Sequence, residues 1–358
     1  MDINSPKFRY KIKRVLLLTA GWVITAIYIT IIQLTSILIV LNSKDMPVKF
    51  SYRQSLIEIS IEVFFAGLVF ALIEVFYFTD RFKNKSFTYA VLIQSFFYAM
   101  SLTLFTLIIF YIELVTNGSN FFSDFSKIAL PLLLTLFIWG PIFVVSIFIL
   151  QVSDRFGHGV LLKFILGKYH KPKEETRIFM ILDIKSSTSI AEALGNVKYF
   201  ELLNDFFYDI TDSIIEARGE IYQYVGDEIV VTWKLENGVM NANALNCFFD
   251  IYNVIKDLSE KYETKYGLVP SFKASIHYGT VTVGEVGVMK REITFSGDVL
   301  NTTARIQELC NKYKEKLIVS KHLLDLISSK DEFILKEIGQ MNLRGRSEPV
   351  VLYSVRKN

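Results

Sequence analysis

Apolar residues are distributed very unevenly along this chain, and that pattern constrains its fold more than any other feature. Residues 14–152 hold long runs with almost no charged side chains, whereas residues 170–358 carry the mixed charge of a globular domain. Hydrophobic residues make up 51% of the chain and aromatic residues 14%, which is high for a wholly soluble enzyme. The sequence therefore predicts a membrane half followed by a globular half.

The first half contains four apolar segments, each long enough to cross a bilayer. A helix needs about 20 apolar residues to span the hydrocarbon core. The segments are residues 15–41, 56–78, 88–114 and 128–152. We therefore expect a four-helix transmembrane domain over residues 14–152, in a plasma or inner membrane. The first segment is too long for a signal-peptide core, and no cleavage pattern follows it.

Basic residues near the ends of the spans predict the orientation of the chain. The tail of residues 1–13 is rich in lysine and arginine, and the short loop after the second span adds three more basic residues. The first loop is also basic, which weakens the contrast, but the third loop has only Lys127. With four spans, both termini are expected in the cytoplasm.

Charged residues within the spans bear on possible ligands. Glu58 and Glu62 lie one turn apart and are expected at the membrane interface, whereas Glu74 falls inside the second span, and its role stays open. No lysine lies mid-span, and all four histidines fall outside the spans. We therefore expect neither a retinal Schiff base nor a bis-histidine haem. The net charge of +3 gives no indication of nucleic-acid binding.

A linker over residues 153–175 joins the two halves. Four apolar residues could form one face of a short amphipathic helix, namely Phe156, Val160, Phe164 and Ile165. Such a helix would couple the spans to the next domain, and a simple tether is the alternative. The only cysteines, Cys247 and Cys310, lie far apart and suggest neither a disulfide framework nor a zinc site.

Apolar patterns over residues 176–358 predict an α+β domain with helices packed on an antiparallel sheet. Residues 177–182 form a strand pattern that ends at Asp183, and residues 221–225 and 229–233 form a hairpin around Gly226 and Asp227. Two amphipathic helices follow the apolar sets Phe200, Leu203, Phe207, Ile210 and Ile214, and Ala244, Phe248, Ile251, Ile255 and Leu258. Further strands are expected at 272–278, 280–288, 317–320, 333–338 and 350–355, with a helix at 299–309.

Asp183 and Asp227 are the carboxylates most suggestive of chemistry. A hairpin beside the first strand would bring both to the same end of the sheet. Paired carboxylates suit Mg²⁺, which takes one or two protein carboxylates together with phosphate oxygens. Taken alone, the two residues could equally be an N-cap and a turn aspartate.

Several motifs in order resemble the catalytic domain of class III adenylate and guanylate cyclases, over about residues 177–356. Asp183-Ile184 opens DIKSST, where many members read D-I-x-G-F-T, and Gly226-Asp227 lies in YVGDE. The segment IHYGTVTVGEVG (276–287) matches a glycine-rich hairpin, and GDVLNTTARI (297–306) matches the segment that carries a transition-state Asn and Arg. The resemblance implies a cyclase domain with a ferredoxin-like sheet over residues 176–358.

The resemblance also implies roles for individual residues. Two divalent cations, Mg²⁺ or Mn²⁺, would be held by Asp183, Asp227 and the Ile184 carbonyl. Asn301 would orient the ribose and Arg305 would neutralise charge at the α-phosphate. Arg344 would bind the terminal phosphate, with Arg346 as a fallback. In this family the aspartates and the Asn/Arg pair of one site come from opposite subunits, which implies a homodimer with two sites.

Two positions bear on which base the resemblance implies. Gln223 stands where adenylate cyclases usually have Lys and guanylate cyclases Glu, and its amide can both donate and accept a hydrogen bond. Thr294 stands at the second selecting position and resembles an adenylate cyclase subgroup, which favours ATP over GTP. A guanylate cyclase and a catalytically weak nucleotide-binding receptor remain alternatives. A diguanylate cyclase is disfavoured, because VGDEI lacks the first glycine of that family's turn.

Overall fold

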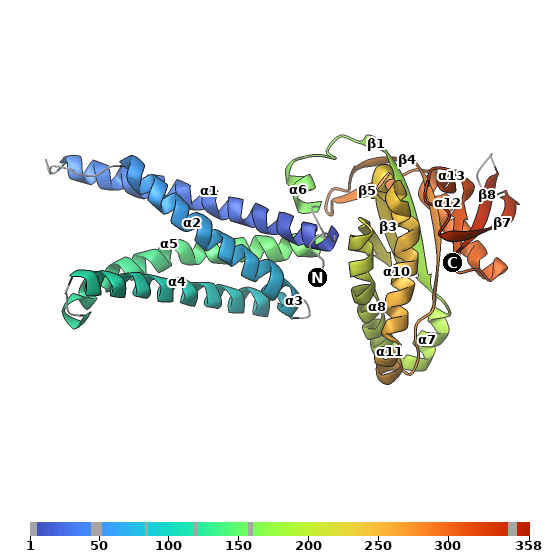
Figure 1. Cartoon of the computed structure of the whole chain (residues 1–358), viewed down its shortest axis with the longest axis horizontal. Helices are drawn as coiled ribbons and strands as arrows, with labels where there is room; N and C mark the ends of the chain where they lie inside the picture. Colours follow the sequence, from blue (N-terminus) through green and yellow to red (C-terminus); the bar gives the residue numbers. More distant parts are fainter. Residues whose placement is uncertain (1–5, 44–51, 83–84, 118–120, 157–159, 343–348) are drawn as a thin grey trace. The chain divides into compact units, whose positions relative to one another are not determined.

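The computed structural model describes residues 6–43, 52–82, 85–117, 121–156, 160–342 and 349–358. They belong to two compact units, one made mainly of residues 8–157 and the other mainly of residues 158–358 (Figure 1). Each unit is described by itself below.

The described part of the first unit has a long helix at each predicted span position: α1 (Pro6–Ser43), α2 (Tyr52–Ile73), α4 (Phe87–Asn117) and α5 (Phe121–Phe156) (Figure 1). Three stretches are long and apolar enough to cross a membrane: Lys11–Ser36, Phe87–Phe105 and Leu136–Ser153. The apolar stretch that begins in α2, Phe64–Phe78, is shorter. The structure therefore supports membrane association, whereas four spans and cytoplasmic termini stay predictions.

Glu74 joins several helices of the first unit. It opens a π-helical segment, η1 (Glu74–Phe78), which leads into α3 (Thr79–Phe82), and it is buried. Its carboxylate accepts hydrogen bonds from Tyr98 Oη (2.6 Å) and Gln94 Nε2 (3.4 Å) of α4, and Gln94 Oε1 accepts one from Gln151 Nε2 of α5 (3.3 Å). This network gives a structural role to the acid whose role the sequence left open.

An eight-stranded sheet forms the centre of the described second unit. Its order is β2-β3-β1-β4-β6-β8-β7, and β5 pairs with β4. The strands are β1 (Lys173–Ile184), β2 (Glu220–Val225), β3 (Glu228–Lys234), β4 (Phe272–Val286), β5 (Glu292–Ser296), β6 (Leu317–Ser320), β7 (Phe333–Met341) and β8 (Val350–Lys357). The α+β prediction is confirmed, but β4 and β6 are parallel. The reason is that the chain crosses over through helix α12 (Asp298–Tyr313) between them.

One face of the sheet is covered by α8 (Asn196–Glu216) and α10 (Asn243–Asp257), which pack side by side (Figure 1). The shorter helices are α6 (Val160–Ile165), α7 (Ser187–Leu194), α9 (Leu235–Val239), η2 (Met240–Ala242), α11 (Ser259–Tyr266) and α13 (Lys321–Leu324). The predicted inward face of α8 was partly wrong, because Phe200 is 65% exposed and Phe206, rather than Phe207, is fully buried. On the opposite face, α12 and β5 cover a second cluster that includes Phe179 and Val299.

The predicted strands at 272–278 and 280–288 are one continuous strand, β4, so the predicted break at Gly279 was wrong. Gly279 lies under α12, where an added Cβ would approach Val299 Cγ2 to 2.6 Å. The glycine is therefore needed for close helix packing and not for a turn. The turn comes later, where Gly287 takes a φ of +106° between β4 and β5.

Substituting Gly279 with alanine is expected to destabilise the second unit by about 1–3 kcal/mol, because the stiff Val299 side chain must be displaced. Thermal unfolding of the solubilised chain measures this loss. Gly284→Ala is the matched control on the same strand, since its added Cβ would lie at an ordinary 3.4 Å from Pro172. Equal melting temperatures for the two variants would contradict the packing role.

Candidate active site

Asp183 and Asp227 lie side by side at one end of the sheet. Strands β1 and β3 pair antiparallel with Asp183 opposite Glu228, so the preceding residue, Asp227, lies in the adjoining turn. That turn is Gly226-Asp227, and Gly226 takes a φ of +63°, as tight hairpin turns require. Besides the effect of burial, the two side chains are near enough for Asp183 to raise the pKa of Asp227. The hairpin pattern thus predicted their proximity correctly, while their metal role stays a prediction.

The electrostatics of this pair favour a bound cation. Burial, and after it the neighbouring Asp183 carboxyl, raise the pKa of Asp227 above its ordinary value, although Ser187 opposes the shift. Burial and the two aspartates likewise raise the pKa of Glu228. Negative charge is therefore concentrated here, and a divalent cation would relieve the repulsion.

Two buried residues that the sequence did not single out bind Asp183. Lys273 Nζ of β4 lies 3.1 Å from Asp183 Oδ2, and Gln307 Nε2 of α12 donates to the same oxygen at 2.9 Å. Each of the two residues is 6% exposed. The available signal for Lys273 was a lysine between two apolar residues, Phe272 and Ala274, at the start of a strand. Together they neutralise and orient the carboxylate.

The donor set fits hard cations that take the rest of their ligands from a substrate. Among the described residues, no group of three or more His, Cys, Asp or Glu side chains is arranged to hold a metal. Two carboxylates completed by phosphate oxygens are a usual arrangement for Mg²⁺. Ile184, whose carbonyl the resemblance adds, ends β1 directly after Asp183.

Ser186 explains one departure from the family motif. It takes a left-handed φ of +56°, at the position where many members have glycine. Glycine adopts this conformation freely, whereas serine does so at a small energetic cost. The backbone turn after Asp183 is therefore kept, although the residue differs.

Helix α12 presents two different faces. Its inward face buries Thr303, Ile306 and Gln307 against the sheet. Asn301 is exposed and Arg305 is half-buried. Arg305 Nη1 is buried without a hydrogen-bond partner among the described residues. A buried unpaired donor costs about 1–3 kcal/mol, so this guanidinium is suited to receive an anionic group.

The two residues predicted to select the base lie on β2 and β5, which contact each other through side chains. Gln223 is exposed on β2 and Thr294 is half-buried on β5. Their sequence neighbours, Tyr222 and Phe295, have ring centroids 4.9 Å apart, and Phe295 N donates to Tyr222 Oη at 3.4 Å. The predicted phosphate-binding Arg344 and its fallback Arg346 lie outside the described residues.

Curated relatives of this chain include adenylate cyclases. It is 34% identical over 216 residues to Adenylate cyclase 2 of Rhizobium meliloti (strain 1021), which covers 60% of this chain and 58% of the relative. It is 30% identical over 186 residues to an adenylate cyclase of Anabaena cylindrica, which covers 51% of this chain and 37% of the relative. The chain thus spans less than two thirds of the length of either relative.

Solved structures show the fold. A bacterial light-regulated adenylyl cyclase superposes with a TM-score of 0.52 at 21% identity, which covers 62% of this chain and 65% of that one. Residues 169–357 match the family described as Adenylate and Guanylate cyclase catalytic domain, and this match includes the paired aspartates and α12. Since the match covers more than half of the sequence, the chain belongs to the adenylate and guanylate cyclase catalytic domain family.

Proposed function

We propose that this chain is a membrane-anchored adenylate cyclase that converts ATP to 3′,5′-cyclic AMP and pyrophosphate. The observation that carries the proposal is the placement of Asp183 and Asp227 at the same end of the sheet, beside the buried Lys273, within a fold of this family. The ribose 3′-oxygen forms a bond to the α-phosphate, its proton leaves to solvent, and the bond to the departing pyrophosphate breaks.

Each step of the proposed reaction is assigned to particular residues of the chain. Asp183 and Asp227 would hold two divalent cations, with the Ile184 carbonyl as a further ligand. When bound, such cations align the triphosphate and stabilise negative charge on its oxygens. Gln307 orients Asp183, and Lys273 offsets part of the negative charge of its carboxylate. Asn301 orients the ribose, and the unpaired Arg305 Nη1 binds the α-phosphate as charge develops there.

The proposed site is completed by a second copy of the chain. Asn301 and Arg305 lie away from the face of α12 that binds Asp183 through Gln307. Asn301 is exposed, and Arg305 Nη1 has no hydrogen-bond partner in the described part of the chain, which suits a site formed with a partner subunit. The expected assembly is a homodimer with two catalytic sites.

A lipid bilayer is the proposed environment of the first unit. Large apolar side chains on its helices are strongly exposed, among them Ile24 (69%), Phe96 (67%) and Phe137 (80%). Surfaces of this kind are unfavourable in water and normal in lipid. We infer that the first unit anchors the enzyme and regulates it, with both termini in the cytoplasm.

Product analysis with each nucleotide tests the proposal. The purified chain, incubated with Mn²⁺ and either ATP or GTP, is expected to form cyclic AMP at a rate at least about tenfold above cyclic GMP, because base-reading hydrogen bonds discriminate strongly. Exposed Gln223 gives a reason to test GTP, since its amide could also pair with guanine. A preference for GTP would make the chain a guanylate cyclase, and no cyclic product from either would refute the proposal.

A further inference from the structure

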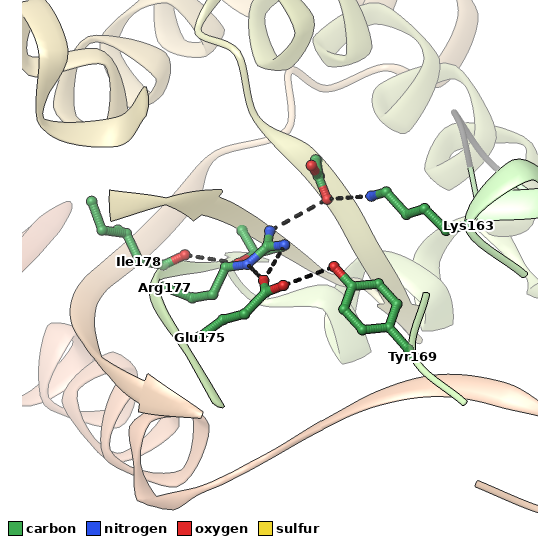
Figure 2. Close-up of polar contacts among 7 residues, drawn as sticks. Lys163, Tyr169, Glu175, Arg177 and Ile178 are labelled. Carbon is green, nitrogen blue, oxygen red and sulfur yellow. Dashed lines mark hydrogen bonds and ion pairs between the residues drawn. The ribbon is translucent and has the colours of Figure 1, made fainter. Parts of the chain in front are cut away.

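An ion-pair network centred on a buried arginine lies in the second unit (Figure 2). This arginine is on the same face of β1 as Asp183, toward the other end of the strand. It is Arg177, which is 1% exposed. Arg177 binds Glu175 through Nη2 (2.7 Å) and Nε (2.8 Å), and it binds Glu220 at the start of β2 through Nη1 (3.3 Å). One guanidinium therefore faces two carboxylates.

The linker supplies the remaining partners of both carboxylates. Lys163 Nζ of α6 lies 3.2 Å from Glu220 Oε2, and the buried Tyr169 donates to Glu175 Oε1 at 3.0 Å (Figure 2). Tyr169 also accepts a backbone hydrogen bond from Glu285 N of β4 at 3.1 Å. Two cations and two carboxylates balance only while α6 stays in place. Without α6, Glu220 would keep only Arg177 among these partners, whereas Glu175 would keep both Arg177 and Tyr169.

The neighbouring charges favour the ionised form of both acids. Although burial opposes it, Lys163 and then Arg177 lower the pKa of Glu220 below its ordinary value. Burial also opposes the shift at Glu175, where Arg177 and Tyr169 lower the pKa. The carboxylates therefore depend on the linker for part of their compensation.

The network continues to the strands that carry the base-reading residues. The Arg177 guanidinium lies over the Phe295 ring at 5.2 Å from its centroid. Phe295 contacts Tyr222, and it directly follows Thr294 on β5, while Tyr222 directly precedes Gln223 on β2. The pairing of β2 with β3 has a bulge at this point, between Ile221 and Gln223. A bulge leaves one residue outside the ladder and bends the strand locally, so the contact of Tyr222 with Phe295 lies at an irregular point of β2.

We propose that Arg177 is a positioning residue for the base-reading strands, and that Lys163 and Tyr169 make its effect depend on how the linker is docked. This inference rests on the proposed cyclase function. In the docked state Arg177 holds Phe295, and Phe295 holds β5 and β2 at the separation that the purine requires. Displacement of α6 releases Glu220 and lets Arg177 move, so that the nucleotide binds more weakly.

Lys163→Met tests this in the full-length chain, because the side chain keeps its length but loses its charge. We expect the KM for ATP to rise about 3- to 10-fold, as for coupling through a packed network, with kcat changed less than about twofold. The affinity for an ATP analogue that lacks the 3′-hydroxyl and so cannot cyclise, measured by calorimetry, should fall by the same factor. Lys163→Arg should behave like the native chain.

Lys171→Met is the matched control, since Lys171 is an exposed lysine of the same linker. An equal rise in KM for Lys171→Met would overturn the proposal, and so would a lower melting temperature of Lys163→Met with unchanged KM and analogue affinity. If the native chain forms no cyclic nucleotide, the proposed function fails. Calorimetry then still decides whether Lys163 affects nucleotide binding.

Discussion

Replacing Asp227 with alanine is expected to lower cyclic nucleotide formation by about 1000-fold or more, equivalent to about 4 kcal/mol of transition-state stabilisation. The reason is that one of the two paired carboxylates is lost, and Asp183 alone would bind the cations poorly. The domain should stay folded, because the substitution relieves repulsion between two neighbouring, half-buried carboxyl groups. Chromatographic product analysis and thermal unfolding measure the two effects.

Asp257→Ala is the matched control for this experiment. Asp257 is an exposed aspartate at the end of α10. Its removal should change neither activity nor melting temperature appreciably. Retention of more than about a tenth of native activity by the Asp227→Ala chain would remove the metal assignment of the pair.

Mixing two inactive variants is expected to restore activity. Asp227→Ala lacks one set of catalytic residues, and Arg305→Ala lacks the set proposed to serve the partner subunit. In a random mixture about half of the dimers contain one chain of each kind, and one of their two sites is intact. Activity should therefore return to about a quarter of the native value. Co-purification through two different affinity tags shows that mixed dimers have formed.

A second mixture controls for non-specific rescue. Asp183→Asn and Asp227→Ala alter the same set of residues, so every site in their mixed dimer carries a defect. This pair should stay inactive. Recovery in the control, or none in the first mixture despite co-purification, would contradict a site divided between two chains.

Local patterns predicted much of the catalytic unit. The apolar run before Asp183 and the Gly226-Asp227 turn are each determined by residues next to them, because a buried strand and a two-residue hairpin have short-range signals. The closeness of Asp183 and Asp227 then followed, because the hairpin was expected to pair beside the strand that ends at Asp183. The spacing within α10 likewise identified its buried face, including Phe248 and Ile251.

Long-range contacts could not be predicted in this way. Gln307 binds Asp183 across 124 residues of sequence, and Lys273 is placed opposite Asp183 only by the register of β1 and β4. Glycine in the middle of β4 resembled a turn, because its close contact with α12 is a tertiary feature. In the linker, the predicted apolar face included Ile165, which is 70% exposed, whereas Tyr169 enters the core.

Helix α12 carries residues that belong to two different proposed catalytic sites. Gln307 binds the chain's own Asp183, while Asn301 and Arg305 are proposed to serve the opposite subunit. In the dimer, each copy of this helix would therefore touch both centres. Nucleotide bound at one centre would shift a helix that also orients an aspartate at the other. Occupancy of the two centres would thus be linked, and the enzyme would respond to nucleotide as a cooperative pair.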